Sequence, residues 1–374
     1  MDGERVKPGA DRQAGSPSRV AIIGIGFRAQ AFLRLASAVP DVFAVDAVVS
    51  RRPHQVVTAL AHGARVLDDI AQLRARRPEF VITCVTPEAN PYLLQQLVRL
   101  DIPVLSETPP AQDLRALEEL WADIGRSGLV QVAEQYPLQP MNAARLAVIR
   151  QGFIGSPTSA YLSVAQTYHA VAVLRAALNV TFEEAEVRAT TFSSSLVHPL
   201  TRAGWTFDST TRETTTTIAT IDFGKAVALY DFTEGQTRNP LRQSGFLVRG
   251  ETGELARDHV VRMADPTTVL DSALVRRQTG VHQDFEVPDL DQITMDGQTL
   301  YRNPYYGSRL SDDEIAMATM LEAMGLWARG SGRAPYPLSV AAQDHAIGLA
   351  IQAAAQSGEP VQVAPGPWAA GSPA

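Results

Sequence analysis

The chain has 374 residues, of which 45% are hydrophobic and 20% charged, and its 33 basic and 40 acidic side chains give a net charge of -7. This length predicts two domains with separate apolar cores rather than one compact fold. The charge balance excludes the strongly basic surface by which proteins bind nucleic acid or anionic lipid, so a small-molecule ligand is expected.

The two ends of the chain are predicted to be tails. Residues 1–17 are rich in Gly, Pro, Ser and charge, which is typical of disorder, and a shorter tail is expected over residues 366–374. No apolar run is long enough to cross a bilayer, and the polar N-terminus does not resemble a secretory signal. A soluble, cytoplasmic protein is therefore expected. The single cysteine, Cys84, lies in an apolar run and is predicted to be a buried strand residue.

The first half of the chain alternates apolar, β-branched runs with amphipathic segments, which predicts repeated βα units on a parallel sheet. We expect a Rossmann domain over residues 18–136, with strands at 20–24, 43–50, 80–85, 103–106 and 129–133. Residues 104–111, VLSETPPA, are predicted to end a strand and to begin a helix at Glu107, since proline is tolerated in the first helical turn.

A glycine-rich turn follows the first predicted strand. Residues 24–29, GIGFRA, fit the pattern G-x-G-x-x-G/A at the start of a predicted helix. Gly24 permits the tight turn, and Gly26 lets the backbone approach a pyrophosphate held at the helix N-terminus. We therefore predict that Gly24, Gly26, Phe27 and Arg28 bind a dinucleotide.

The second predicted strand ends in Ser50, Arg51 and Arg52, beside the expected position of the cofactor ribose. Guanidinium groups suit a phosphate and leave a 2′-hydroxyl without an acceptor, so NADP(H) is favoured over NAD(H). Asp46 is the alternative ribose-binding residue, because its distance from Gly24 along the chain suits that role. It precedes the strand end, however, and is expected to point into a helix or solvent.

The second half, residues 137–365, is predicted to be an α+β domain on a large, mostly antiparallel open sheet. Helices are expected at 140–150, from about 169, at 312–329 and at 338–357, and strands at 158–166 and 246–249. Strands 214–221 and 226–232 read as a hairpin with glycine at its turn. Such a sheet exposes a broad face, so a homodimer or homotetramer through this sheet is expected.

Several short motifs, in this order, resemble the Gfo/Idh/MocA oxidoreductases. They are Thr86-Pro87, Glu107-x-Pro109, the G-x-I-G of residues 152–155, a helix led by His169, and the closing stretch AAAQSGEPV at 353–361. The resemblance extends over residues 19–363. It implies NAD(P)-dependent hydride transfer to or from a ketone or alcohol carbon of a sugar, cyclitol or related small molecule, with Thr86 and Pro87 near the cofactor.

The chain departs from the family pattern at Thr108. The family signature Glu-Lys-Pro maps onto Glu107-Thr108-Pro109, and the family lysine contacts the reacting hydroxyl and the nicotinamide ribose. Threonine can donate a hydrogen bond there but supplies no positive charge. Of the downstream motif Asp-x-Gly-x-His, only His169 is present.

The resemblance therefore implies that His169 is the general acid or base. Thr108, Glu107 and Tyr136 are its candidate accessory groups, and Glu107 and Gln135 are also placed at the cofactor. Glu134, Gln135 and Tyr136 follow the last predicted strand of the Rossmann domain, where the family has residues near the nicotinamide and the substrate. Two other polar segments, 231–242 and 303–309, are candidates to shape the pocket or cover its entrance, although each also fits an ordinary loop or packing contact.

Alternative functions stay open from the sequence. Without the lysine, the chain also fits a cofactor-binding sensor or structural partner, or an enzyme that uses a tightly bound cofactor with no net redox change. No metal site is predicted, because the seven histidines are scattered and no paired-cysteine spacing occurs. A serine nucleophile is not predicted either, since G-x-S-x-G is absent from the sequence.

Overall fold

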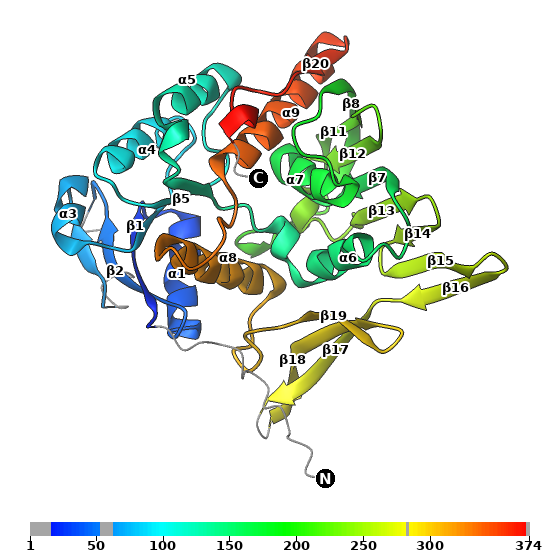
Figure 1. Ribbon diagram of the computed structural model, residues 1–374, viewed down its shortest axis with the longest axis horizontal. Coiled ribbons are helices and arrows are strands. Elements are labelled where there is room, and N and C mark those ends of the chain that lie inside the picture. Colours follow the sequence, from blue (N-terminus) through cyan, green and yellow to red (C-terminus); the bar gives the residue numbers. More distant parts are fainter. Residues whose placement is uncertain (1–15, 53–62, 282–283, 372–374) are drawn as a thin grey trace.

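Figure 1 shows a blue-to-cyan sheet built from the first third of the chain and a larger, mostly green-to-yellow sheet built from later segments. The computed structural model describes residues 16–52, 63–281 and 284–371. The predicted tail over residues 1–17 lies, up to residue 15, outside the described residues.

The N-terminal sheet has six parallel strands in the order β3-β2-β1-β4-β5-β6. Its strands are β1 (Ser18–Ile23), β2 (Phe43–Val49), β3 (Arg65–Leu67), β4 (Phe80–Thr83), β5 (Val104–Ser106) and β6 (Val130–Val132), and its helices are α1 (Phe27–Ala38), α3 (Leu73–Arg76), α4 (Asn90–Arg99) and α5 (Leu114–Ile124). The strand order reverses between β1 and β4, and ligands of doubly wound sheets bind beyond the carboxyl ends of the strands at such a point. The predicted Rossmann fold is confirmed.

The central strands are apolar along most of their length because helices cover both faces of the sheet. Val20, Ala21 and Ile22 of β1 are completely buried, and so are the first three residues of β4. The short strand β3 begins with the exposed Arg65 and has no fully buried residue, so it lacks the apolar run by which the other strands were predicted.

The second sheet has nine strands in the order β16-β15-β14-β13-β7-β12-β11-β8-β20. They are β7 (Pro157–Ser163), β8 (Ala185–Val197), β11 (Thr211–Asp222), β12 (Val227–Thr233), β13 (Gly245–Gly250), β14 (Gly253–Ala256), β15 (His259–Asp265), β16 (Thr268–Ala273) and β20 (Val361–Val363). Among the described strand pairs of this nine-stranded sheet, only β7 and β12 are parallel, so the prediction of a mostly antiparallel sheet is confirmed.

Smaller elements complete the second half. They are the helices α6 (Pro140–Arg150), α7 (Thr167–Leu178), α8 (Asp312–Ala328) and α9 (Leu338–Ser357), the hairpin of β9 (Leu200–Thr201) and β10 (Gly204–Trp205), and the sheet of β17 (Val275–Val281), β18 (Asp284–Met295) and β19 (Gln298–Arg302). Gly224 has a φ of +78° in the turn between β11 and β12, which confirms the predicted hairpin.

The C-terminal helices return to the Rossmann sheet. Helix α8 packs against β2, β4 and α6, and Figure 1 shows it between the two halves. The backbone N–H of Val132 in β6 donates to the carbonyl of Tyr336 just before α9 (2.8 Å). In α9, Asp344 forms a buried ion pair with Arg175 of α7. These contacts fix α7 and α8 beside the carboxyl edge of the Rossmann sheet.

Two predictions about local structure are wrong. The helix expected to begin at Glu107 begins at Leu114, where Asp113 caps it by accepting from the N–H of Ala116 (2.8 Å), and residues 107–113 form a loop. Cys84 is half-buried and lies just beyond β4, because that strand ends at Thr83.

Trp368, within the segment expected to be a C-terminal tail, is buried and donates its indole N–H to Gln343 (2.7 Å). No helix in the described part of the chain is long and apolar enough to cross a membrane.

Candidate functional site

A cavity of about 700 Å³ lies between the glycine-rich loop and the second half of the chain. The Rossmann side contributes the loop after β1, Thr86 after β4, and Glu107 and Thr108 after β5. Gln135 and Tyr136 after β6 continue the lining, and His169 on α7 faces them. The structure thus brings most of the predicted site residues together around one hollow.

The glycine-rich loop has the geometry that a dinucleotide needs. Gly24 has a φ of +111°, and a Cβ there would lie 2.2 Å from the carbonyl oxygen of Cys84. Gly26 is the N-cap of α1 and forms no side-chain cap, and a Cβ added to it would meet no atom within 4 Å. The first-turn N–H groups of α1 therefore lack a side-chain cap at the cavity, and the helix dipole favours an anion there.

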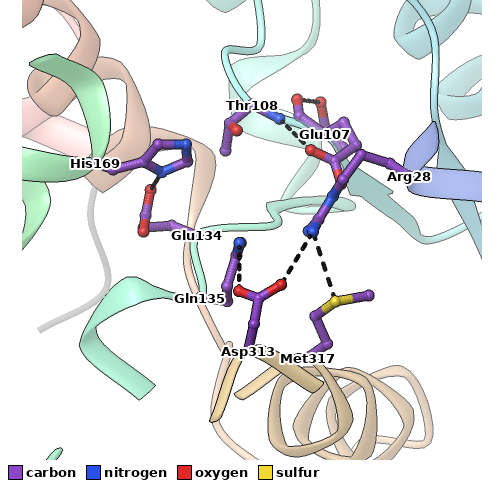
Figure 2. A network of polar contacts seen from close by, with 9 residues as sticks. Arg28, Glu107, Thr108, Glu134, Gln135, His169, Asp313 and Met317 are labelled. Carbon is purple, nitrogen blue, oxygen red and sulfur yellow. Dashed lines mark hydrogen bonds and ion pairs between the residues drawn. The ribbon is translucent and has the colours of Figure 1, made fainter. Parts of the chain in front are cut away.

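Arg28 links the glycine-rich loop to the loop after β5. Its Nε donates to the Glu107 Oε1 atom at 2.6 Å, and its Nη1 lies 3.7 Å from the Asp313 carboxylate on α8. Figure 2 shows the guanidinium between these two carboxylates, with Met317 beside it. The buried Nη2 atom has no hydrogen-bond partner among the described residues. Net attraction to Glu107 and Asp313 raises the pKa of Arg28, although burial opposes it.

The ring of His169 is paired with the carboxylate of Glu134, which lies just after β6. Its Nδ1 lies 2.6 Å from Oε2 of Glu134, whose side chain is completely buried. The other oxygen, Oε1, accepts from the backbone N–H of Tyr136 (2.9 Å). A carboxylate fixed at both oxygens holds the proton on Nδ1, so we assign Nε2 as the ring atom that is free to exchange a proton.

The electrostatics of this pair favour a protonated ring. Burial disfavours the imidazolium ion, but the attraction and hydrogen bond of Glu134, with Glu107 further away, raise the pKa of His169 above its ordinary value. In Figure 2 the second ring nitrogen lies on the side of Thr108. Nε2 forms no hydrogen bond to a described residue, which leaves it available to a ligand in the cavity.

Tyr136 packs against the ring of His169, with centroids 4.5 Å apart and planes inclined by 27°. Burial, together with the Asp313 and Glu134 carboxylates, raises the pKa of Tyr136 to about 12. The phenol therefore stays protonated near neutral pH and can act as a hydrogen-bond donor.

Thr108 lines the same cavity, and its backbone N–H donates to the Glu107 Oε2 atom (3.2 Å). Glu107 thus binds Arg28 with one oxygen and its own loop with the other. Cys84 also lines the cavity, and burial raises the pKa of its thiol well above the ordinary value, so the thiol stays protonated near neutral pH.

The predicted ribose-binding residues lie just beyond the end of β2 and are not part of this lining. Ser50 is buried and its Oγ accepts from the N–H of Arg52 (3.0 Å), whereas Arg51 and Arg52 are exposed. Asp46 forms an ion pair with Arg76 of α3, in agreement with the expectation that it points into a helix. Pro87 follows Thr86 in the turn before α4 and is not part of the lining.

The sequence did not single out Glu134 as the partner of His169, nor Asp313 and Arg202 as lining residues. Thr237 and Arg238, within the polar segment 231–242, do line the cavity, while the segment 303–309 does not. Tyr305 of that segment is buried instead and donates to Glu322 (2.8 Å). Of Glu134, Asp313 and Arg202, only Glu134 has a signal in the sequence: it is an acidic residue directly after a buried strand.

A family model described as "Oxidoreductase family, NAD-binding Rossmann fold", named GFO_IDH_MocA, matches residues 18–135. This agrees with the resemblance that the motifs indicate. No curated protein matches the chain in sequence.

Solved structures similar to the chain include an oxidoreductase from Agrobacterium radiobacter in complex with NAD+, L-tartaric acid and magnesium, with 16% identity, a TM-score of 0.67, and coverage of 92% of this chain and 98% of that chain. A myo-inositol dehydrogenase from Corynebacterium glutamicum has 17% identity and a TM-score of 0.64, covering 93% and 99%. A levoglucosan dehydrogenase with NADH and levoglucosan has 16% identity and a TM-score of 0.66, covering 93% and 100%. At this level of identity the likeness concerns the fold.

Proposed function

We propose that the protein transfers hydride between a nicotinamide cofactor and a ketone or alcohol carbon of a small polyhydroxylated molecule, because residues 18–135 match the model of the Gfo/Idh/MocA oxidoreductases. The substrate class is a sugar, cyclitol or related compound, in line with the polyol dehydrogenases of similar fold. A bound nicotinamide would accept or supply the hydride at its C4 atom.

The residues of the glycine-rich loop fit such a cofactor. A side chain at Gly24 would collide with the carbonyl of Cys84, and Gly26 keeps the approach to the N-terminus of α1 clear. These residues would hold the pyrophosphate through backbone N–H groups. Thr86 and Gln135, which line the cavity further in, would face the nicotinamide half.

The observation that carries the proposal is the contact of His169 with Glu134. Glu134 holds Nδ1, so Nε2 is directed into the cavity as the atom that takes a proton from an alcohol being oxidised or returns it to a ketone being reduced. Tyr136, stacked on the ring, restricts its rotation. Thr108 would supply a hydrogen bond to the reacting oxygen, where the family uses a charged lysine.

The test of this role is turnover followed at the absorbance of the reduced nicotinamide, over a panel of sugars, cyclitols and their ketones. We expect His169→Gln to lower kcat by at least about 100-fold while the dissociation constant for the cofactor stays within about twofold. Full turnover by this variant would exclude His169 as the proton-transfer group.

Within this function we propose NADP(H) as the preferred cofactor. Arg51 and Arg52 follow β2, where the adenosine ribose of a bound cofactor lies, and both are exposed. The double variant Arg51→Gln/Arg52→Gln should weaken NADPH binding about tenfold or more and leave NADH binding nearly unchanged. Equal catalytic efficiency of the wild-type protein with both cofactors would disprove the preference.

A second candidate is suggested by Thr108. Since no ammonium group occupies this position, a tightly held cofactor could serve elimination, hydrolysis or epimerisation without a net redox change. Product analysis separates the two: conversion of substrate with no change in the amount of reduced cofactor favours this second reaction.

We also propose self-association through the second sheet. Phe192 of β8, Ile218 of β11 and Leu229 of β12 are large apolar side chains that are 49%, 42% and 39% exposed. Burying them against a second copy would remove apolar surface from water. Sedimentation should give a dimer or tetramer for the wild type, and Ile218→Glu should shift it towards the monomer.

A further inference from the structure

Two arginines from the second half of the chain line the cavity without a charged partner. Arg202 lies between β9 and β10, and Arg238 ends the short helix η5 (Gln236–Arg238). Neither side chain forms an ion pair or hydrogen bond with a described residue. Two positive charges are thus directed at the same hollow and are available to a ligand.

The carboxylates around the cavity are already engaged. Glu107 binds Arg28, and Asp313 lies near both Arg28 and the Gln135 amide, whose nitrogen donates to it at 3.3 Å. Glu134, behind the lining, is held by His169. Among the described charged residues of the lining, Arg202 and Arg238 are therefore those without a partner.

Each of the two guanidinium groups lies beside another residue of the cavity lining. Arg202 stacks on Phe27 of the glycine-rich loop, with its guanidinium carbon 4.6 Å from the ring centroid. Arg238 is near enough to Tyr136 for its charge to act on the phenol, and Tyr136 stacks on His169. Both arginines are exposed, so an incoming ligand can reach them.

We propose that the substrate carries an anionic group, a carboxylate or a phosphate, which Arg202 and Arg238 bind while the reacting carbon lies at Nε2 of His169. Guanidinium groups bind such anions through paired, charge-assisted hydrogen bonds. This inference rests on the proposed function and narrows its substrate from a neutral polyol to a sugar acid or sugar phosphate.

The test compares matched neutral and anionic compounds with the cofactor-loaded protein: sorbitol against gluconate, and glucose against glucose 6-phosphate. Binding is measured by calorimetry and turnover by nicotinamide absorbance. We expect one anionic compound to bind about tenfold or more tightly than its neutral counterpart, with an affinity that falls as salt rises. Which of the two binds identifies carboxylate or phosphate. Equal affinities within both pairs would overturn the proposal.

Variants locate the effect. Arg238→Gln should weaken the anionic compound about tenfold and leave the neutral one unchanged. Arg242→Gln is the matched control, because Arg242 lies on the same loop and outside the cavity lining, and we expect it to change neither. Equal weakening of neutral and anionic compounds by Arg238→Gln would refute an anion-binding role.

Arg202→Gln distinguishes the substrate from the cofactor, whose pyrophosphate is also an anion. We expect this variant to weaken the anionic compound and to keep the cofactor affinity measured in its absence. Loss of cofactor affinity alone would remove Arg202 from the proposed site. If the arginines bind an anion but no compound is turned over, the proposed function is wrong and this inference stands. If only neutral polyols are turned over efficiently, the proposed function stands and this inference is wrong.

Discussion

Arg28 and Glu107 join two loops at the carboxyl edge of the Rossmann sheet, with 2.6 Å between Nε and Oε1. One loop follows β1 and would carry the cofactor, and the other follows β5 and contains Thr108. Their side chains are 23% and 12% exposed. This contact ties the position of Thr108 to the glycine-rich loop, and under the proposed function it would couple cofactor binding to the reaction centre.

Removing the charge of Glu107 should destabilise the protein. In Glu107→Gln, Arg28 loses its closest carboxylate in a mostly buried setting, where its Nη2 already lacks a described partner. We expect the free energy of unfolding to fall by about 1–3 kcal/mol, measured by urea denaturation. Arg115→Gln is the control, since its ion pair with Glu119 is 82% and 64% exposed and should be worth less than about 0.5 kcal/mol. Equal losses in both variants would contradict a special role for Arg28 and Glu107.

The pair of His169 and Glu134 predicts a pH dependence with a defined sign. In Glu134→Gln burial still disfavours the imidazolium ion while the main opposing charge is gone, so the pKa of His169 should fall. Alcohol oxidation needs a neutral His169 ring. The acidic limb of the pH–rate profile for alcohol oxidation should therefore move to lower pH in this variant.

The same pair contributes to stability. Since the folded state raises the pKa of His169 above its unfolded value of about 6.5, the contribution is fully present below that value and is lost as pH rises through the folded pKa. An NMR titration of the histidine C2–H signals measures the pKa of His169 in the wild type and in Glu134→Gln. The signal that is missing in His169→Gln is the one that belongs to His169. An unchanged titration in Glu134→Gln would show that Glu134 does not control this ring.

Thr108→Lys tests the departure from the family signature. An ammonium group in the cavity beside His169 disfavours a second positive charge, so the pKa of His169 should fall. Oxidation of neutral polyols should rise if the lysine reaches the position that it has in the family. Thr108→Met has similar bulk without charge and is the control. A pKa that falls equally in both variants would assign the effect to desolvation, and the charge argument would fail.

The fold was predictable because its signals are local. The apolar runs of β1 and β4, the glycine-rich loop and the turn at Gly224 each depend on a few neighbouring residues. The helix expected at Glu107 failed for the opposite reason: a carboxylate before two prolines satisfies the rules of a helix start, but the side chain is bound by Arg28, which is 79 positions away in the chain.

The candidate site was only partly predictable for the same reason. His169, Thr108 and Tyr136 follow from a family pattern, and the structure places them around one cavity. The partner of His169 depends on how α7 packs against the end of β6, which no local pattern encodes. Arg202 lies in a two-stranded hairpin whose strands have two residues each, and its position over Phe27 arises from contact between the two halves of the chain.

Two alanine variants of the glycine-rich loop should separate folding from cofactor binding. At Gly24 an added Cβ meets the Cys84 carbonyl at 2.2 Å, and the φ of +111° disfavours any side chain. Gly24→Ala should therefore lower the free energy of unfolding by more than about 2 kcal/mol and abolish cofactor binding.

Gly26→Ala is the matched counterpart. Its φ is -70°, an added Cβ meets no atom within 4 Å, and the residue lines the cavity. The unfolding free energy should change by less than about 1 kcal/mol, whereas the cofactor dissociation constant should rise at least about tenfold, because the methyl group occupies the path of the pyrophosphate to the helix N-terminus. Calorimetric titration with NADPH and NADH measures this constant. Wild-type affinity in Gly26→Ala would mean that the cofactor does not approach the backbone here, and the cofactor placement that underlies the proposed function would have to be abandoned.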